Sequence, residues 1–341
     1  MKKIAYIEID THAEIAADFL DLMKDSKEFS VDYYFSEKIK NQIPRYDKNI
    51  WLSDNSMILD QLKSKKYDLI IIGTVHRYFS TFSRIIQKYK TAVIVHNLNF
   101  SKASKFNLFK NIFKDDLFYR LKLLWKEGLT NSSKVYQSAS QLVLDKSFSS
   151  SEYHFLSLFY TKEFVQNENE KLTVVLPGGV SQKRRDYKHV LNTIQKSESA
   201  ENIEFVFLGK AKGEELENIK KVSEKIDLKY FTERVSQEEF EIWMKKADVL
   251  WCPIQQETEF FSQKEIYGKS KMTGNIGDAI KFGKMAVFPE NYLSNHDFIV
   301  GEKVDVFQQF YDLKKINYNF QKEFSKQIVL GNLENTLKNL I

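Results

Sequence analysis

The sequence predicts an α/β protein of two domains, each built on a parallel β-sheet that helices cover on both faces. The chain has 341 residues, which exceeds one ordinary hydrophobic core and suits two domains of roughly 150 residues each. Apolar residues make up 43% of it and charged residues 28%, a balance typical of globular proteins. Short, continuous apolar runs alternate with helical stretches in both halves, and this order is typical of buried parallel strands.

The first half, residues 1–165, contains the first series of strands and helices. An apolar run at 4–9 precedes a polar turn and a helical pattern in which Ile15, Phe19 and Leu22 recur on one face. Further apolar runs predict strands at 31–35, 68–73, 91–97 and 141–145, with helices near 53–65 and 77–89.

The second half, residues 171–316, repeats this order after a polar segment, 165–171, that predicts a linker. Strands are predicted at 171–179, 203–209, 228–232, 248–253 and 285–289, and helices near 186–197, 211–226, 236–246 and 275–283. In the last segment, 317–341, apolar residues recur at helical spacing, so we expect a terminal helix that lies back across the first domain.

Charge and cysteine content limit the classes of function. The formal net charge of +5 permits a phosphate-bearing ligand or an anionic membrane surface, and it is too small for a nucleic-acid-binding protein. The single cysteine, Cys252, excludes an internal disulfide framework and a cysteine-rich zinc site. Glu8 and Asp10 interrupt the apolar stretch near the N-terminus, so no signal peptide is predicted. No window approaches the roughly 18 apolar residues of a membrane span, and we expect a cytoplasmic protein.

Glycines and lysines gather in residues 257–289, in a chain with only 12 glycines. Thr273-Gly274-Asn275 leads into a predicted helix, and Lys271 precedes it closely. A glycine-rich loop before a helix presents free backbone N–H groups to an anion, and because the helix dipole contributes only about 0.3–2 kcal/mol, the lysines would matter as much. The alternative is a surface loop whose glycines supply positive φ angles.

A basic cluster follows the first predicted strand of the second half. That strand ends at Gly178-Gly179, and Lys183, Arg184 and Arg185 come directly after it. Arginine binds phosphate oxygens through two parallel hydrogen bonds, and positive charge there would stabilise a leaving diphosphate. The alternative is an exposed helix start with a local Arg–Asp pair, and the sequence leaves open which arginine faces a ligand.

In the first half, a titratable loop follows the first predicted strand. His12 lies between Asp10 and Glu14 at the carboxyl end of that strand, where parallel sheets bind ligands. A histidine ordinarily titrates near pH 6.5, which suits a general base, and Asp10 or Glu14 could serve as the base or orient the ring. The alternative is that Asp10 or Thr11 caps the following helix, with Glu14 as the capping-box partner of Thr11.

The segment 257–289 resembles the donor-binding signature of GT-B glycosyltransferases. Glu265, Tyr267-Gly268 and Asp278 occupy the order of that signature, ahead of the predicted strand 285–289. The resemblance implies that Glu265 approaches the donor sugar and that Asp278 binds the ribose hydroxyls, since a carboxylate accepts two hydroxyl hydrogen bonds. Retaining members of the family usually have seven residues between the two acids. Here twelve separate Glu265 from Asp278, and Glu257 with Glu265 has the usual spacing but does not fit the other positions.

The resemblance extends to residues 177–187 and implies two Rossmann-like domains that face a central cleft. His96, at the end of a predicted strand, resembles a position that lines this cleft, and His76 is a weaker candidate of the same kind. The expected catalytic residues are His12, Asp10 and Glu265. The expected donor-binding residues are Arg184, Arg185, Lys183, Gly179, Tyr267, Gly268, Lys271, Thr273, Gly274, Asn275 and Asp278. No Asp-x-Asp motif, Walker loop or Gly-x-Gly-x-x-Gly motif is present, and we expect no metal.

The expected function is transfer of a sugar from a UDP- or GDP-type donor, with no permanently bound cofactor, to a saccharide or lipid-linked saccharide. A nucleotide-sugar epimerase or hydrolase on the same scaffold is an alternative, because a fold does not fix a reaction. A catalytically inactive two-domain ligand-binding protein is another.

Residues 101–129 combine aromatic and basic side chains at helical spacing. Phe106, Phe109 and Phe113 begin the apolar series, and lysines fill the intervening positions. Such a segment could bind an anionic membrane surface peripherally, which would suit a lipid-linked acceptor. The alternative is a basic amphipathic helix packed on the first domain.

Overall fold

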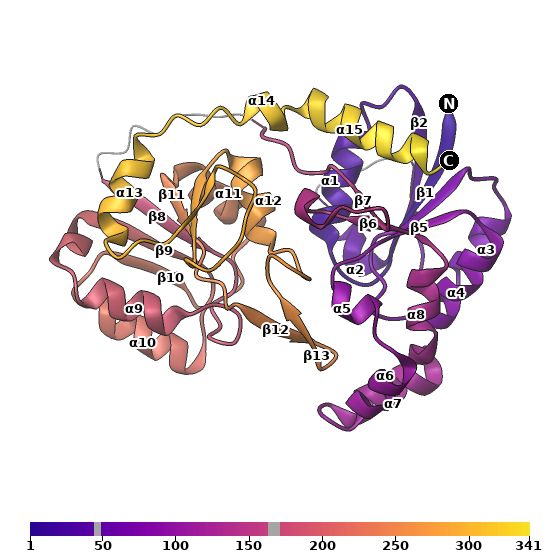
Figure 1. Ribbon diagram of the computed structural model, residues 1–341, viewed down its shortest axis with the longest axis horizontal. Helices are drawn as coiled ribbons and strands as arrows, with labels where there is room; N and C mark the ends of the chain where they lie inside the picture. Colours follow the sequence, from indigo (N-terminus) through magenta and orange to yellow (C-terminus); the bar gives the residue numbers. More distant parts are fainter. Residues whose placement is uncertain (44–48, 163–170) are drawn as a thin grey trace.

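The computed structural model describes residues 1–43, 49–162 and 171–341. Two parallel sheets, one from each half of the chain, lie side by side in an elongated molecule (Figure 1). The predicted linker falls outside the described residues except for Lys171. Each sheet carries helices on both sides, as continuous apolar strands require.

The first sheet has seven strands in the order β3-β2-β1-β4-β5-β6-β7. The strands are β1 (Lys2–Glu8), β2 (Phe29–Phe35), β3 (Ile50–Leu52), β4 (Leu69–Ile72), β5 (Thr91–Ile94), β6 (Ser140–Val143) and β7 (Tyr153–Phe155). The five inner strands coincide with the predicted apolar runs. The two edge strands β3 and β7 were not predicted, because three residues are too few to give a recognisable period.

The α-helices of this half are α1 (Ala13–Met23), α2 (Glu37–Lys40), α3 (Ile58–Lys63), α4 (Phe79–Lys88), α5 (Leu98–Ser101), α6 (Lys105–Ile112), α7 (Leu117–Lys126) and α8 (Ser132–Gln137). One segment differs from the expected single helix. The segment 101–129 is therefore not one helix. It is broken before Asp116, which has a left-handed backbone with φ 48°, and α6 and α7 project from the domain as a helical hairpin (Figure 1).

The second sheet has six parallel strands in the order β10-β9-β8-β11-β14-β15. The strands are β8 (Leu172–Pro177), β9 (Ile203–Lys210), β10 (Leu228–Phe231), β11 (Val249–Trp251), β14 (Met285–Phe288) and β15 (Ile299–Gly301). The helices are α9 (Tyr187–Gln195), α10 (Gly213–Ser223), α11 (Gln237–Lys246), α12 (Gly274–Phe282) and α13 (Val306–Lys314). The short edge strand β15 and the helix α13 were not predicted, and the other strands and helices of this domain were.

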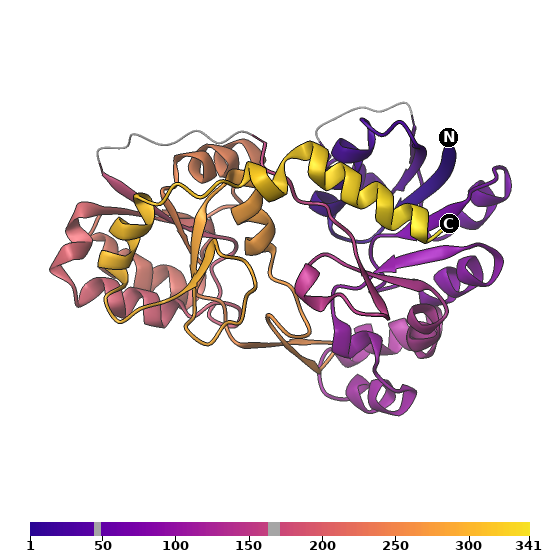
Figure 2. The same cartoon turned by 45° about the horizontal axis from the view of Figure 1, so that its top comes forward.

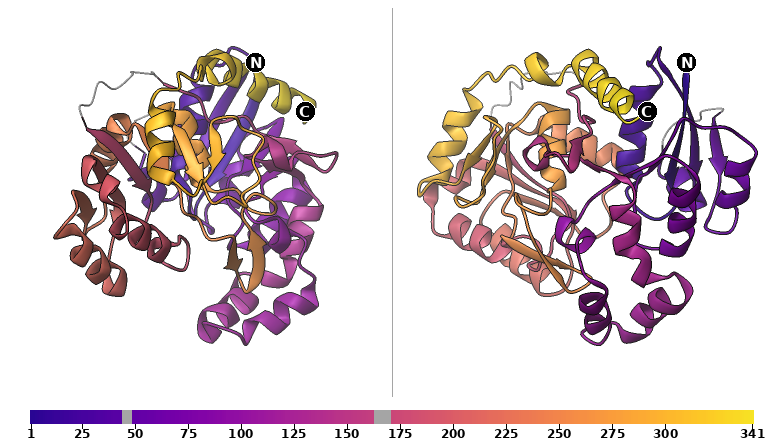
Figure 3. Two further views of the ribbon diagram at one scale, coloured as in Figure 1. Left: turned by 60° about the vertical axis from the view of Figure 1, so that its left-hand side comes forward. Right: turned by 45° about the vertical axis from the view of Figure 1, so that its right-hand side comes forward.

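A two-stranded antiparallel hairpin interrupts the second domain between β11 and α12. It consists of β12 (Glu257–Phe260) and β13 (Gln263–Ile266) and was not predicted. Its turn residues Phe261 and Ser262 have left-handed backbones with φ 51° and 54°, a conformation uncommon for residues other than glycine. The hairpin reaches from the second domain toward the helices α5 and α6 of the first (Figure 3).

The C-terminal segment returns to the first domain, as predicted. It forms α14 (Gln321–Phe324) and α15 (Lys326–Asn339), separated at Ser325, whose backbone is extended. Ser26 donates a hydrogen bond to Glu334 at 2.6 Å, and Thr336 donates one to the carbonyl of Phe155 at 3.0 Å. The last helix therefore lies across α1 and the first sheet (Figure 2).

Candidate active site

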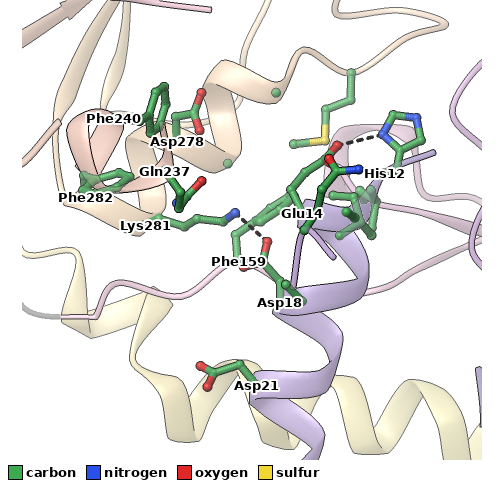
Figure 4. A pocket seen from close by; sticks show the side chains of 18 of the residues that line it. His12, Glu14, Asp18, Asp21, Phe159, Gln237, Phe240, Asp278, Lys281 and Phe282 are labelled. Carbon is green, nitrogen blue, oxygen red and sulfur yellow. Dashed lines mark hydrogen bonds and ion pairs between the residues drawn. The ribbon is translucent and has the colours of Figure 1, made fainter. Parts of the chain in front are cut away.

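A cavity of about 1710 Å³ lies between the two domains. Its wall in the first domain comes from α1 and the ends of β4 and β5, and its wall in the second comes from α11 and α12 (Figure 4). An ion pair between Asp18 of α1 and Lys281 of α12 joins the two walls. The volume is ample for a nucleotide sugar, and both domains contribute polar groups to it.

Three histidines converge at one end of this cavity. His12 follows β1, while His76 and His96 follow β4 and β5, and the three strands are neighbours in the sheet. The rings of His12 and His96 are stacked with centroids 4.1 Å apart, and the ring of His76 lies 5.9 Å from that of His12. The carboxyl ends of adjacent parallel strands meet at one edge, which explains the cluster.

His12 is held so that its ring faces the cavity. Its backbone is left-handed with φ 61°, and it occupies the N-cap of α1 without a side-chain capping bond. Its Nδ1 lies 2.8 Å from Oε1 of Glu14. The alternative expectation that Asp10 or Thr11 caps this helix is therefore wrong.

The environment keeps the other two rings uncharged. Burial and the nearby charges of His12 and Lys271 lower the pKa of His76 to about 3. Burial, together with the neighbouring histidines, lowers the pKa of His96 well below its ordinary value, and its Nε2 lies 2.8 Å from the carbonyl oxygen of Gly73. Burial raises the pKa of Glu14, but the hydrogen bond and charge of His12 outweigh it and leave that pKa lowered.

Asp10 does not line the cavity. Its backbone N–H donates to Glu8, a fully buried carboxyl that also accepts from the backbone of Thr11 and from the hydroxyl of Thr74. Glu8 thus ties the loop that carries His12 to the loop after β4. Burial raises the pKa of Glu8 to about 8.

In the second domain, the start of α12 is joined to the loop after β8. Thr273 caps the helix by accepting from the N–H of Asn275 at 3.4 Å. Arg185 donates to the side-chain oxygen of Asn275 at 3.2 Å and to the carbonyl of Gly179 at 3.3 Å. Gly274 lines the cavity, and a side chain there would meet nothing within 4 Å. This end of the helix is therefore open to a ligand.

Asp278 lies in the cavity wall one turn further along α12. Asn275 donates to its carboxylate at 3.3 Å. Burial raises the pKa of Asp278 to about 6, against the opposing effects of Lys281, Asn275 and Arg185. A carboxyl group with this pKa changes charge close to neutral pH.

Glu265 has a different place from the one the resemblance implies. It does not line the cavity, and its side chain is fully buried between the domains. Its two oxygens accept the backbone N–H groups of Phe100 and Asn99 at 2.9 and 3.3 Å. Twelve intervening residues and the hairpin β12–β13 carry it away from Asp278.

The predicted residues therefore divide into three sets. Those that line the cavity are His12, His96, Lys271, Gly274 and Asp278. In the second set, Thr273 and Asn275 lie at the start of α12, Arg185 donates to Asn275, and Gly179 accepts from Arg185. Those outside the cavity wall are Asp10, Lys183, Arg184, Glu265, Tyr267 and Gly268. Of the basic cluster, Arg185 alone points at the helix, because Lys183 and Arg184 are exposed.

Two features of the cavity were not predicted from the sequence. Asp18 recurs with Glu14 on one face of α1, a helical spacing that could have indicated an acidic wall. Asn97 accepts a hydrogen bond from the ammonium of Lys271, and its Nδ2 lies 3.2 Å from Nε2 of His76. No sequence pattern signals this contact, because it joins two domains.

Within residues 1–43, 49–162 and 171–341, no group of three or more His, Cys, Asp and Glu side chains is arranged to hold a metal ion. Over the same ranges, no helix combines the length and apolar character needed to cross a membrane.

The architecture is similar to that of solved structures over their whole lengths. The apo form of the lipopolysaccharide outer core galactosyltransferase WaaB has a TM-score of 0.58 at 9% identity, over 99% of this chain and 100% of that one. The UDP-GlcNAc 2-epimerase of Neisseria meningitidis bound to UDP-GlcNAc has 0.54 at 11%, over 98% and 100%. WaaG, a glycosyltransferase involved in lipopolysaccharide biosynthesis, has 0.52 at 11%, over 99% and 95%. No protein-family model and no curated protein matches the sequence.

The chain thus has the GT-B glycosyltransferase fold, with two Rossmann-like domains facing each other, as the sequence predicted. The structural similarity establishes the fold alone, because a fold does not fix a reaction.

Proposed function

We propose that this protein is a glycosyltransferase that transfers a sugar from a nucleotide-diphosphate donor to a saccharide or lipid-linked acceptor. The observation that carries the proposal is the composition of the cavity. An open helix start with Arg185 behind it lies on one side, and a histidine supported by a carboxylate lies on the other. Anion binding and proton transfer are the two tasks that such a reaction needs.

The second domain would bind the donor. The N–H groups at the start of α12 that Thr273 does not engage would donate to the oxygens of the diphosphate, together with Arg185 and Lys271. Positive charge at this point stabilises the negative charge that develops as the diphosphate leaves. Asp278 would accept hydrogen bonds from the ribose hydroxyls.

The first domain would bind and activate the acceptor. Nδ1 of His12 is engaged by Glu14, so Nε2 is left to take the proton of an acceptor hydroxyl. The hydroxyl oxygen would then attack the anomeric carbon as the bond from that carbon to the diphosphate breaks. Glu14 would stabilise the imidazolium that forms, whereas His76 and His96 would remain neutral. This sequence of steps inverts the anomeric centre.

A nucleotide-sugar 2-epimerase is the second candidate, because an enzyme bound to UDP-GlcNAc shares the fold. The two functions differ in one observable. A transferase releases its nucleotide at a useful rate only when an acceptor is supplied, while an epimerase interconverts sugars on the nucleotide without one.

Thermal-shift measurements with UDP, GDP, CDP and their sugars test the donor site. We expect stabilisation by one nucleotide, because a ligand that binds only the folded state raises its stability. Absence of a shift with every nucleotide would contradict the proposed function.

Donor affinity is expected to depend on the charge of Asp278. The carboxylate form accepts two hydroxyl hydrogen bonds, so affinity for the nucleotide sugar should fall as the pH decreases through about 6. The raised pKa means that the folded protein gains stability from protonation of this group as the pH falls, so titration of Asp278 does not itself unfold the protein. In Asp278→Asn, calorimetric titration should show weaker binding at pH 8 and no pH dependence in this range. If Asp278→Asn showed the same pH dependence of donor affinity as the wild type, groups other than Asp278 would be responsible for it.

The helical hairpin α6–α7 supports a membrane-bound acceptor. Seven exposed large apolar side chains lie on or between its helices: Phe106, Phe109, Phe113, Leu117, Phe118, Tyr119 and Trp125. Residues 101–129 contain seven Lys and Arg against three Asp and Glu, so +4 of the net charge of +5 is concentrated there. Aromatic side chains beside lysines suit the interface of an anionic bilayer.

Replacing Phe118 and Trp125 together by serine is expected to weaken binding to vesicles of phosphatidylglycerol and phosphatidylcholine by at least about tenfold, since burying one such side chain contributes about 1.5–3 kcal/mol. Co-sedimentation measures the effect. Ile242→Ser, at a half-exposed site on α11, is the control and should bind as the wild type does. A wild-type protein that does not sediment with anionic vesicles would contradict this part of the proposal.

A further inference from the structure

The hairpin β12–β13, residues 257–266, crosses from the second domain to the first, and we call it the interdomain arm. Two residues of the first domain hold its tip. Asn111 of α6 donates to the carbonyls of Phe261 and Ser262 at 3.2 and 3.3 Å, and Arg120 of α7 donates to the hydroxyl of Ser262 at 2.8 Å. The guanidinium of Arg120 also lies 4.7 Å from the ring centre of Phe261. These contacts hold Phe261 and Ser262, the two turn residues with left-handed backbones.

The base of the interdomain arm provides a helix cap to the other domain. The N–H groups of Asn99 and Phe100 lie in the first turn of α5 and have no partner within that helix. Glu265 accepts both of them, and the carbonyl of Ser270 accepts the N–H of Leu98 at 2.9 Å. Asn97, the N-cap residue of α5, makes no side-chain capping bond of its own. The capping carboxylate therefore comes from the donor-binding side of the cavity.

Because Glu265 caps α5 in place of Asn97, the side chain of Asn97 is left to make contacts in the cavity. Its oxygen accepts from Lys271, which precedes α12 in the second domain, and its nitrogen lies 3.2 Å from Nε2 of His76 in the histidine cluster. Lys271 and the start of α12 are thereby held at a fixed place relative to the histidines. The contacts run in one series from Glu265 through α5 and Asn97 to both sides of the cavity.

We propose that Glu265 is a positioning residue, which sets the distance between the start of α12 and the histidine cluster by capping α5 from the opposite domain. The effect of this positioning on catalysis rests on the proposed function. Its effect on the arrangement of the two domains does not, because their relative position is measurable without a substrate.

The first test measures the distance between the domains. Cys252 is the single cysteine and is fully buried, so Lys63→Cys on α3 and Glu217→Cys on α10 can carry spin labels at exposed sites. We expect one narrow distance distribution in the otherwise native protein and a broader distribution with longer distances in Glu265→Ala. Glu257→Ala is the matched control, because Glu257 lies on the same hairpin, is half exposed and pairs with Lys264. An unchanged, narrow distribution in Glu265→Ala would overturn the inference.

A second measurement distinguishes positioning from a purely structural effect. In Glu265→Ala the contact from Lys271 to Asn97 should loosen, and the ring of His76 should titrate closer to its ordinary range by NMR. An unchanged His76 titration in a variant with separated domains would overturn the link from Glu265 to the histidine cluster. Glu265→Gln keeps an acceptor for one N–H group and should give an intermediate result in both measurements.

A third comparison separates this role from contact with the donor sugar. The ratio of the affinities for UDP and UDP-N-acetylglucosamine should be the same in Glu265→Ala as in the wild type. Selective loss of affinity for the nucleotide sugar would instead place Glu265 on the sugar and overturn the inference. In turnover assays kcat is expected to fall by about 10²-fold with KM for the donor unchanged, as for a misplacement of about 1 Å. Failure of the proposed function would appear separately, as absence of nucleotide binding in the wild type.

Discussion

Replacing His12 by alanine is expected to slow sugar transfer by about 10²- to 10⁴-fold, the contribution of a positioned general base. The reason is geometric, because the half-buried side chain of His12 lines the cavity and has a carboxylate partner at 2.8 Å. Desolvation and neighbouring positive charge lower the pKa of His76 to about 3 and that of His96 well below its ordinary value, so both rings are weak bases and neither can replace His12. Turnover is measured as acceptor-dependent release of nucleotide from the nucleotide sugar that gives the largest thermal shift.

The binding of the donor should survive this substitution. His12 belongs to the first domain, so His12→Ala is expected to retain the thermal shift with nucleotide and to lose kcat with little change in KM. His154→Ala provides a control, because His154 is an exposed histidine on β7 and does not line the cavity. Unchanged turnover in His12→Ala would remove His12 from the reaction and direct attention to Glu14.

All strands of the two sheets except the three-residue edge strands β3, β7 and β15 could be predicted, because their signal is local. In the inner strands nearly every residue is buried, so each appears as a continuous apolar run such as the one at Leu69–Ile72. The histidines were likewise predicted at strand ends. Their contact with one another depends on β1, β4 and β5 being neighbours, which is a property of the folded sheet.

The interdomain arm could not be predicted because its conformation is imposed from outside. Its turn, Phe261-Ser262, contains neither glycine nor asparagine, the residues that signal a two-residue hairpin. Asn111 and Arg120, some 140 to 150 residues away in sequence, hold that turn. The observed role of Glu265 could not be predicted for the same reason. A sequence pattern does not reveal that its carboxylate accepts hydrogen bonds from backbone N–H groups of the other domain.

The second large effect is expected at Arg185. A hydrogen bond to a charged group contributes about 1.5–3 kcal/mol, so Arg185→Ala should weaken the binding of a nucleoside diphosphate by about 10- to 150-fold. Arg185 is placed for this role because its guanidinium reaches both the loop after β8 and the residue that follows Gly274 at the start of α12. Its Nε is buried and, among the described residues, has no hydrogen-bond partner, so a bound phosphate oxygen would satisfy a group that is otherwise unpaired.

A comparison of ligands with and without phosphates tests whether Arg185 contacts the diphosphate. Arg185→Ala should reduce the affinity for UDP more than that for uridine, because a nucleoside without phosphates makes no contact with the guanidinium. Arg184→Ala is the matched control: the neighbouring arginine has the same charge but an exposed side chain, and its loss should change calorimetric affinity little. Arg185→Lys keeps the charge without the planar fork and should recover only part of the affinity. Equal losses for UDP and uridine in Arg185→Ala would mean that the substitution disturbs the fold around β8 and α12, and the diphosphate site would then have to be sought at Lys271.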